Sequence, residues 1–197
     1  FMISLIWLWI EIRRDEGDLP NWINFDPLVG LKWKKWIGLL SLSTLITLFS
    51  GVYVSTTPGA NYGCGVGGVV ESWPLCNGRF IQGIDDWELQ SQIVHRWLVG
   101  IVGVMMALSS YKIWKECEHG QSGVVLRNWI WASSATYFGN ALLGASYIIS
   151  WNDGSFSEYL SLAHLMVATI SFTILATAWL GVTIISSSGR AKVIVGT

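Results

Sequence analysis

The chain has 197 residues, of which 52% are hydrophobic, 13% are charged and 13 are tryptophan. Soluble domains carry about 25% charged residues, so this composition excludes an ordinary soluble globular protein and indicates an integral membrane protein. The formal net charge of -1 is uninformative, but the positions of Lys and Arg along the chain predict its orientation in the bilayer. No nucleic-acid partner is expected.

The chain opens with an apolar stretch, residues 1–10, which is too short to cross a bilayer because a spanning helix needs about 20 residues. It is either the end of a longer span or an interfacial anchor. No basic n-region or small-residue cleavage site is visible, so no signal peptide is expected. The polar residues 11–35 complete an N-terminal segment, 1–35, which reaches a membrane boundary at Lys32, Lys34 and Lys35.

Four apolar stretches follow that are long enough to span a membrane: 36–54, 91–114, 128–150 and 160–185. Because unpaired backbone polar groups are costly in lipid, each stretch is expected to be an α-helix. The loop 55–90 is long and rich in glycine, whereas the turns 116–127 and 151–159 are short, which favours antiparallel neighbours. The sequence therefore predicts an all-α integral membrane protein. An antiparallel four-helix transmembrane bundle occupies 36–185, and a cytoplasmic tail, 186–197, follows it.

Lysine and arginine concentrate on one side of the predicted bundle. That side carries Lys32, Lys34, Lys35, Lys112, Lys115, Arg127, Arg190 and Lys192. On the other side only Arg79 lies in a loop, so the C-terminus is expected in the cytoplasm or matrix and the 55–90 loop outside. The membrane is then a plasma membrane or a mitochondrial inner membrane. Outside, Cys64 and Cys76 can form a disulfide, whereas Cys117 is expected to be a free thiol on the inner side.

The candidate functional site contains His95 and Arg96, near the outer end of the second span, and His164, near the outer end of the fourth. Both helices enter from the outer face of an up-down bundle, so the two imidazoles lie level, roughly 6 Å below the boundary. Two level histidines facing each other can hold a six-coordinate haem iron. The alternative is that each histidine bonds to a neighbouring serine or threonine. Arg96 and Arg79 are candidates for binding haem propionates, although Arg79 is better explained as a solvated loop charge.

Five short motifs follow one another between about residues 45 and 185. They are Gly51-Val52-Tyr53-Val54-Ser55, Ser72-Trp73-Pro74-Leu75-Cys76-Asn77-Gly78, His95-Arg96, Asn140-Ala141-Leu142-Leu143-Gly144 and Leu162-Ala163-His164-Leu165. Together they resemble the haem A synthase family, membrane enzymes that oxidise a methyl group of haem O to the formyl group of haem A. The resemblance implies that Cys64 and Cys76 are the family's outer-loop cysteine pair. It also implies that His95 and His164 ligate the iron of haem b, haem O or haem A.

The family's enzymes consist of two related four-helix halves, and this chain resembles one of them. The resemblance therefore implies that a second copy of the chain, or a partner membrane subunit, supplies the other half. The family usually has a glutamate three residues before the histidine of the HR motif, where this chain has Gln92. An amide can hydrogen-bond but cannot act as a base. Glu88, seven residues before His95, is either a substitute catalytic carboxylate or a solvated acid.

The expected function is a haem A synthase-like oxidoreductase that holds a haem between two histidines and oxidises haem O. The alternative is a non-catalytic cytochrome b-type subunit of a respiratory membrane complex, which Gln92, the missing second half and the extra N-terminal segment favour. A haem-free structural membrane subunit is the third interpretation.

Overall fold

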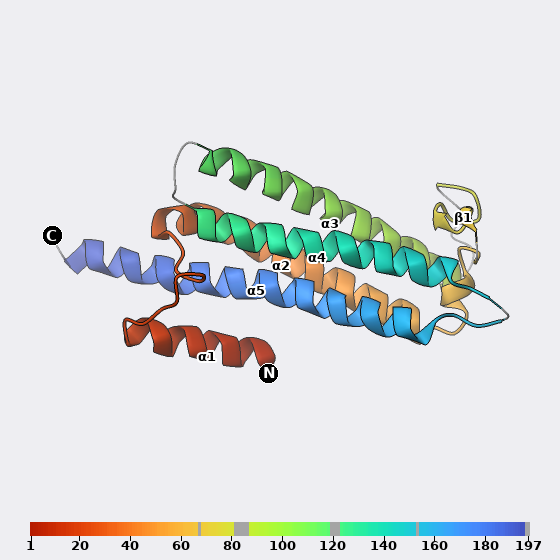
Figure 1. Ribbon diagram of the computed structural model, residues 1–197, viewed down its shortest axis with the longest axis horizontal. Coiled ribbons are helices and arrows are strands. Elements are labelled where there is room, and N and C mark those ends of the chain that lie inside the picture. Colours follow the sequence, from red (N-terminus) through yellow and green to blue (C-terminus); the bar gives the residue numbers. More distant parts are fainter. Residues whose placement is uncertain (67, 81–86, 119–122, 153, 196–197) are drawn as a thin grey trace. The chain divides into compact units, whose positions relative to one another are not determined.

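The computed structural model describes residues 1–66, 68–80, 87–118, 123–152 and 154–195, and of residues 87, 88 and 187–195 it describes the backbone alone. The described chain is all-α apart from one short pair of strands (Figure 1). Its five α-helices are α1 (Met2–Asp15), α2 (Pro27–Thr56), α3 (Trp87–Cys117), α4 (Val124–Ile149) and α5 (Glu158–Val195). Between α2 and α3 lie the 3-10 helix η1 (Ala60–Tyr62) and the parallel strands β1 (Val69–Val70) and β2 (Trp73–Pro74).

Three helical stretches in the described part of the chain are long and apolar enough to cross a membrane: Pro27–Thr56, Leu89–Cys117 and Glu158–Ser186. The protein is therefore a multi-pass membrane protein. Helix α4 is not among these three stretches, and it carries the buried polar residues Ser133 and Ser134. The fourth span stays a prediction from the sequence.

Helix α2 begins earlier than the apolar pattern predicts, because a polar cap sets its start. The Oδ1 atom of Asp26 accepts hydrogen bonds from the backbone N–H groups of Leu28 and Val29, both at 2.9 Å. Pro27 occupies the first helical position, where its fixed φ angle suits a helix and its missing N–H costs nothing. Lys32 therefore belongs to the first turns of α2 rather than to a polar linker. At the other end of the chain, the backbone of α5 stays helical to Val195, beyond the predicted end of the fourth span.

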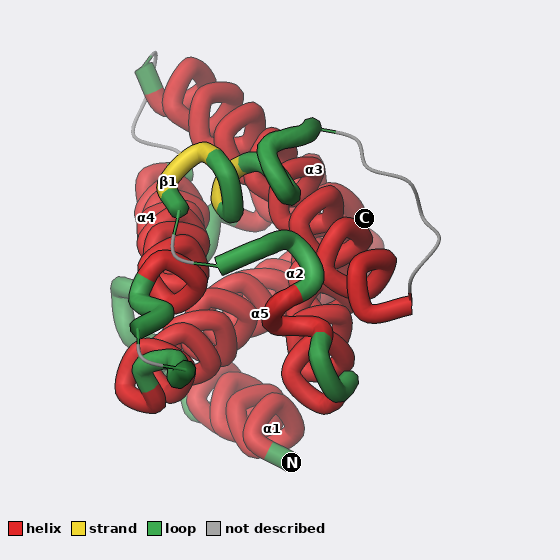
Figure 2. The backbone as a smooth tube through the Cα atoms, turned by 90° about the vertical axis from the view of Figure 1, so that its right-hand side faces the viewer, coloured by secondary structure: helices red, strands yellow, loops and turns green. Residues whose placement is uncertain are grey.

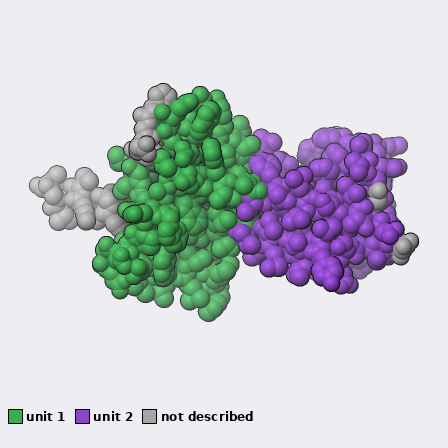
Figure 3. Space-filling model, in the orientation of Figure 1, with its two compact units in different colours: residues 1–43, 105–135, 171–197 green, residues 44–104, 136–170 purple. Residues whose placement is uncertain are grey.

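The chain forms two compact units, coloured separately in Figure 3. Each unit contains part of α2, α3, α4 and α5. Unit 1 comprises residues 1–43, 105–135 and 171–197, and unit 2 comprises residues 44–104 and 136–170. In unit 2, each helix is joined to the next by a hydrogen bond: Ser50 with His95, Val99 with Tyr137, and Asn140 with His164. Both candidate histidines and both disulfide cysteines therefore lie in unit 2.

Unit 1 joins α2 to α3 through polar side chains. Trp36 donates its indole N–H to the hydroxyl of Ser109 at 2.7 Å. The carboxylate of Glu116 accepts hydrogen bonds from Lys32 Nζ at 2.6 Å and from the indole N–H of Trp33 at 2.9 Å. Lys32, one of the cations that predict the orientation, is thus paired with a carboxylate on the next helix.

Candidate functional site

A disulfide between Cys64 and Cys76 closes part of the loop between α2 and α3. Figure 2 draws the described loops and turns in green. Asn77 and Gly78 have φ angles of 48° and 72°, which are typical of a two-residue hairpin turn. The backbones of Cys76 and Arg79 on either side of this turn exchange hydrogen bonds of 2.9 and 3.0 Å. The backbone N–H of Asn77 donates to the carbonyl oxygen of Cys64 at 3.1 Å. The Asn-Gly pair after Cys76 therefore folds the chain so that the two cysteines meet.

Arg96 connects helix α3 to this loop. Its Nη1 atom donates to the carbonyl oxygens of Ser72 and Leu75, both at 2.8 Å. Its Nε atom donates to Oε1 of Gln92 at 3.2 Å. The remaining Nη2 atom is buried and has no hydrogen-bond partner among the described residues. Nη1 and Nε of Arg96 are thus bonded within the protein, and Nη2 is available to bind an acceptor from outside the described residues.

The other polar residues singled out from the sequence have different surroundings. Gln92 is buried, with 4% of its surface exposed, and its carbonyl oxygen faces Arg96 rather than a histidine. Arg79 is exposed on the disulfide loop and pairs with Cys76 through its backbone. The side chain of Glu88 lies outside the described residues.

His95 is held by α2. Its Nδ1 atom lies 2.8 Å from the hydroxyl oxygen of Ser50, and that hydroxyl donates its hydrogen to the carbonyl oxygen of Thr47 at 2.6 Å. Since a serine hydroxyl has a single hydrogen, the hydrogen between Ser50 and His95 belongs to His95 Nδ1. The neutral imidazole therefore keeps a free lone pair on Nε2.

His164 is held by α4 in a parallel way. Its Nδ1 atom lies 2.9 Å from the backbone carbonyl oxygen of Asn140. A carbonyl oxygen can only accept, so Nδ1 carries the hydrogen and Nε2 carries the lone pair. In both histidines, Nδ1 therefore contacts the preceding helix and Nε2 carries the lone pair.

The two imidazoles are half-buried and both lie in unit 2. Within the described residues, no cluster of three or more His, Cys, Asp or Glu side chains could hold a metal ion. Two imidazoles alone are too few for a typical protein zinc site, which uses three or four protein ligands. They suffice for an iron whose four other ligands come from a porphyrin.

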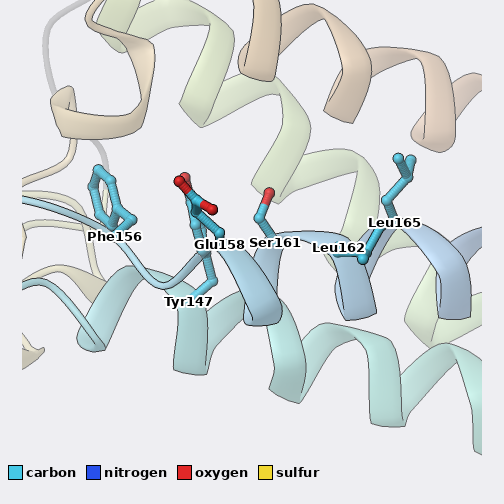
Figure 4. A pocket seen from close by; sticks show the side chains of 6 residues that line it. All are labelled: Tyr147, Phe156, Glu158, Ser161, Leu162 and Leu165. Carbon is cyan, nitrogen blue, oxygen red and sulfur yellow. The ribbon is translucent and has the colours of Figure 1, made fainter.

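A separate hollow of about 320 Å³ lies beside the first turns of α5 (Figure 4). Its lining residues are Tyr147, Phe156, Glu158, Ser161, Leu162 and Leu165. The rings of Tyr147 and Phe156 are stacked, with centroids 4.8 Å apart. Neither candidate histidine is among its lining residues.

Sequence reasoning did not identify the residues that hold the two rings. Ser50 and Asn140 supply the Nδ1 partners, and Gly51 and Gly144 are the α2 and α4 residues against which the rings pack. Gly51, Asn140 and Gly144 are all members of the motifs that define the family resemblance, which was the available signal. The motifs indicated that these residues matter, but not which side chain each of them contacts.

Comparison with known proteins gives one family. Residues 1–176 match the COX15-CtaA model, described as cytochrome oxidase assembly protein. Haem A synthases from Bacillus cereus strain AH187 and Bacillus anthracis strain A0248 are each 32% identical to the chain over 139 residues. The matched region covers 70% of this chain and 40% of either relative, so it spans less than half the length of these proteins. No solved structure matches the chain significantly.

Proposed function

Because this chain belongs to the COX15-CtaA family of cytochrome oxidase assembly proteins, we propose that it is a haem-binding membrane oxidoreductase of the haem A synthase type. In this proposal His95 and His164 would hold the iron of a haem, and the reaction is the oxidation of a methyl group of haem O to give haem A. The observation that carries the proposal is that Nδ1 of each ring lies within hydrogen-bond distance of an oxygen on the preceding helix, 2.8 Å from the hydroxyl of Ser50 and 2.9 Å from the carbonyl of Asn140, so that Nε2 is the nitrogen left for a ligand.

The hydrogen bonds are of the kind that metal-binding histidines make. A ligating imidazole almost always donates its second ring N–H to a carboxylate, a backbone carbonyl or water, which fixes the tautomer and strengthens the ligand. Asn140 supplies such a carbonyl to His164. For His95, the hydroxyl of Ser50 takes this place. The bond to Ser50 is the one expected if His95 were only a structural residue bonded to a neighbouring serine. It engages Nδ1 alone, however, and a haem iron would bind Nε2.

The proposed architecture is the antiparallel four-helix bundle, with α4 as the fourth span. Hydrogen bonds join the end of α2 to the beginning of α3, and the end of α4 to the beginning of α5, as antiparallel pairs require. The positive-inside distribution supports an orientation with the Cys64–Cys76 loop outside and the C-terminus in the cytoplasm or matrix.

Arg96 is the proposed contact for a haem propionate. Its Nη2 atom is a buried donor without a partner, and a carboxylate is the acceptor that a guanidinium binds most strongly. The Nη1 atom already holds the disulfide loop. A propionate at Nη2 would therefore bind to an arginine that is oriented in advance. The exposed Arg79 has no comparable feature and is proposed as a solvated charge.

When bound, the haem supplies the redox chemistry of the site. The residues of this chain contribute binding and orientation: His95 and His164 present their Nε2 atoms, and Arg96 presents a fixed positive charge. Gln92 can only hydrogen-bond, and its carbonyl oxygen is engaged by Arg96. Three residues before His95, where the family usually has a glutamate, this chain therefore has no carboxylate that could act as a base.

That observation on Gln92 favours a second candidate, a non-catalytic cytochrome b-type subunit with the same bis-histidine site. In both cases a second copy of the chain or a partner membrane subunit is the proposed partner.

Haem extraction from the purified protein, followed by chromatography, separates the candidates. Haem O together with haem A supports the oxidoreductase, haem b alone supports the cytochrome, and absence of haem refutes both. His95→Ala and His164→Ala should each abolish the low-spin spectrum, and free imidazole should restore it by replacing the lost ring. An unchanged spectrum in either variant would contradict the ligand proposal.

A further inference from the structure

We propose that Gly51 and Gly144 are positioning residues that set the orientation of the His95 and His164 rings, and through them the electronic properties of the bound haem. This inference rests on the proposed bis-histidine site. Each glycine lies on the helix that precedes its histidine in the chain, so α2 positions the ring on α3 and α4 positions the ring on α5.

Gly51 packs against the edge of the His95 ring. A Cβ atom placed on Gly51 would lie 3.0 Å from Cε1 of His95, 3.6 Å from Nδ1 and 3.7 Å from Nε2. The residue before it, Ser50, accepts the hydrogen bond from Nδ1. The hydrogen bond and the glycine contact therefore act on the same edge of the ring.

Gly144 packs more tightly against His164. A Cβ atom on Gly144 would lie 2.8 Å from Cε1, 3.2 Å from Nδ1 and 3.4 Å from Nε2. One turn earlier on the same helix, the carbonyl oxygen of Asn140 accepts from Nδ1. Because carbon atoms in contact are ordinarily about 3.5–4.0 Å apart, a methyl group here would have to displace the ring.

Displacing Cε1 also moves Nε2, the nitrogen that would bind the haem iron. Cε1 lies between the two ring nitrogens, so pressure on Cε1 moves Nε2 while Nδ1 remains tied to its acceptor. The ring then tilts about the hydrogen bond, and the angle between the two imidazole planes changes. The splitting of a low-spin haem's electronic levels depends on that angle, as does its reduction potential.

Two other glycines provide controls: Gly139 lies on α4 with Gly144, and Gly100 lies on α3, the helix that carries His95. A Cβ atom at Gly100 of α3 or at Gly139 of α4 would have nothing within 4 Å. Alanine is the better helix former by about 1 kcal/mol, so these substitutions do not weaken the helices. Any effect seen at Gly51 and Gly144 but absent at the controls therefore comes from the ring contact.

The experiment compares Gly51→Ala, Gly144→Ala, Gly100→Ala and Gly139→Ala in the purified holoprotein by low-temperature electron paramagnetic resonance and redox titration. We expect shifted low-spin g values and a shifted midpoint potential in Gly51→Ala and Gly144→Ala, with the larger shift in Gly144→Ala. Both controls should match the wild type. Signals that stay unchanged in Gly51→Ala and Gly144→Ala would overturn the inference while leaving the bis-histidine site intact. A wild-type protein without a low-spin haem would instead overturn the proposed function.

A second comparison covers the case in which Gly144→Ala loses its haem. In His164→Ala with free imidazole, the ligand is no longer tied to α5 and can move away from an added methyl group. The double variant Gly144→Ala/His164→Ala with imidazole should therefore recover the same spectrum as His164→Ala with imidazole. Failure of the double variant to recover would show that Gly144 is needed for something other than the ring position, and would overturn the inference.

Discussion

Arg96 offers a quantitative test of how the disulfide loop is attached to the helix that carries His95. Arg96→Ala removes two charge-assisted hydrogen bonds from Nη1 to the carbonyl oxygens of Ser72 and Leu75. It also removes the longer bond from Nε to Gln92. The loop should therefore separate from α3 more often in the variant than in the wild type.

The size of the effect follows from these contacts. Two hydrogen bonds from a charged donor contribute about 3–6 kcal/mol together. In the haem-free protein, removing the unpartnered Nη2 donor returns roughly 1–3 kcal/mol, because a buried donor without a partner is unfavourable. The midpoints of these two ranges differ by about 2.5 kcal/mol, which corresponds to an increase of roughly 60-fold in the population of the open loop, at about 1.4 kcal/mol per factor of ten.

The disulfide itself reports the opening. Cys64 and Cys76 are 0% and 5% exposed, so a soluble phosphine reductant reaches the bond only when the loop opens. The reduction rate of Arg96→Ala should exceed that of the wild type by a factor close to the population change. Arg79→Ala, on the same loop but exposed, is the matched control and should stay within about twofold of the wild type. Equal reduction rates for Arg96→Ala and the wild type would refute the reasoning.

Three further predictions concern single contacts. Ser50→Ala removes the Nδ1 partner of His95 and should weaken haem binding by about 10- to 100-fold in titration of the haem-free protein, whereas Ser55→Ala, whose hydroxyl bonds its own helix, should not. Tyr137→Phe removes the bond to the carbonyl oxygen of Val99 and should cost about 1 kcal/mol, or about 2–4 °C in melting temperature; an undisturbed melting curve would contradict a role for this bond. Cys117 should react with a membrane-impermeant maleimide from the cytoplasmic or matrix side alone, and labelling from the opposite side would reverse the proposed orientation.

The tertiary contacts also change how the polar residues of α3 are interpreted. In the sequence, Gln92 stands where the resembled family usually has a glutamate, and Arg96 is a candidate for binding a haem propionate. In the structure, the two side chains bond to each other, and Arg96 additionally holds the loop. Gln92 thus helps to orient the arginine, a role that an amide oxygen can fill and that does not require a base.

The sequence by itself determined that the protein is a membrane protein of the family to which its motifs point, because composition, apolar length and short motifs are local properties. It also brought Cys64 and Cys76 into consideration as a pair, and the structure contains that disulfide. The tertiary structure decided what the apolar pattern could not, such as the start of α2 at its Asp26 cap. It alone decided which nitrogen of each histidine is free, because Ser50 lies 45 residues from His95 along the chain and Asn140 lies 24 from His164. Such contacts depend on how helices pack side by side, and a pattern read along one helix carries no information about the neighbouring helix.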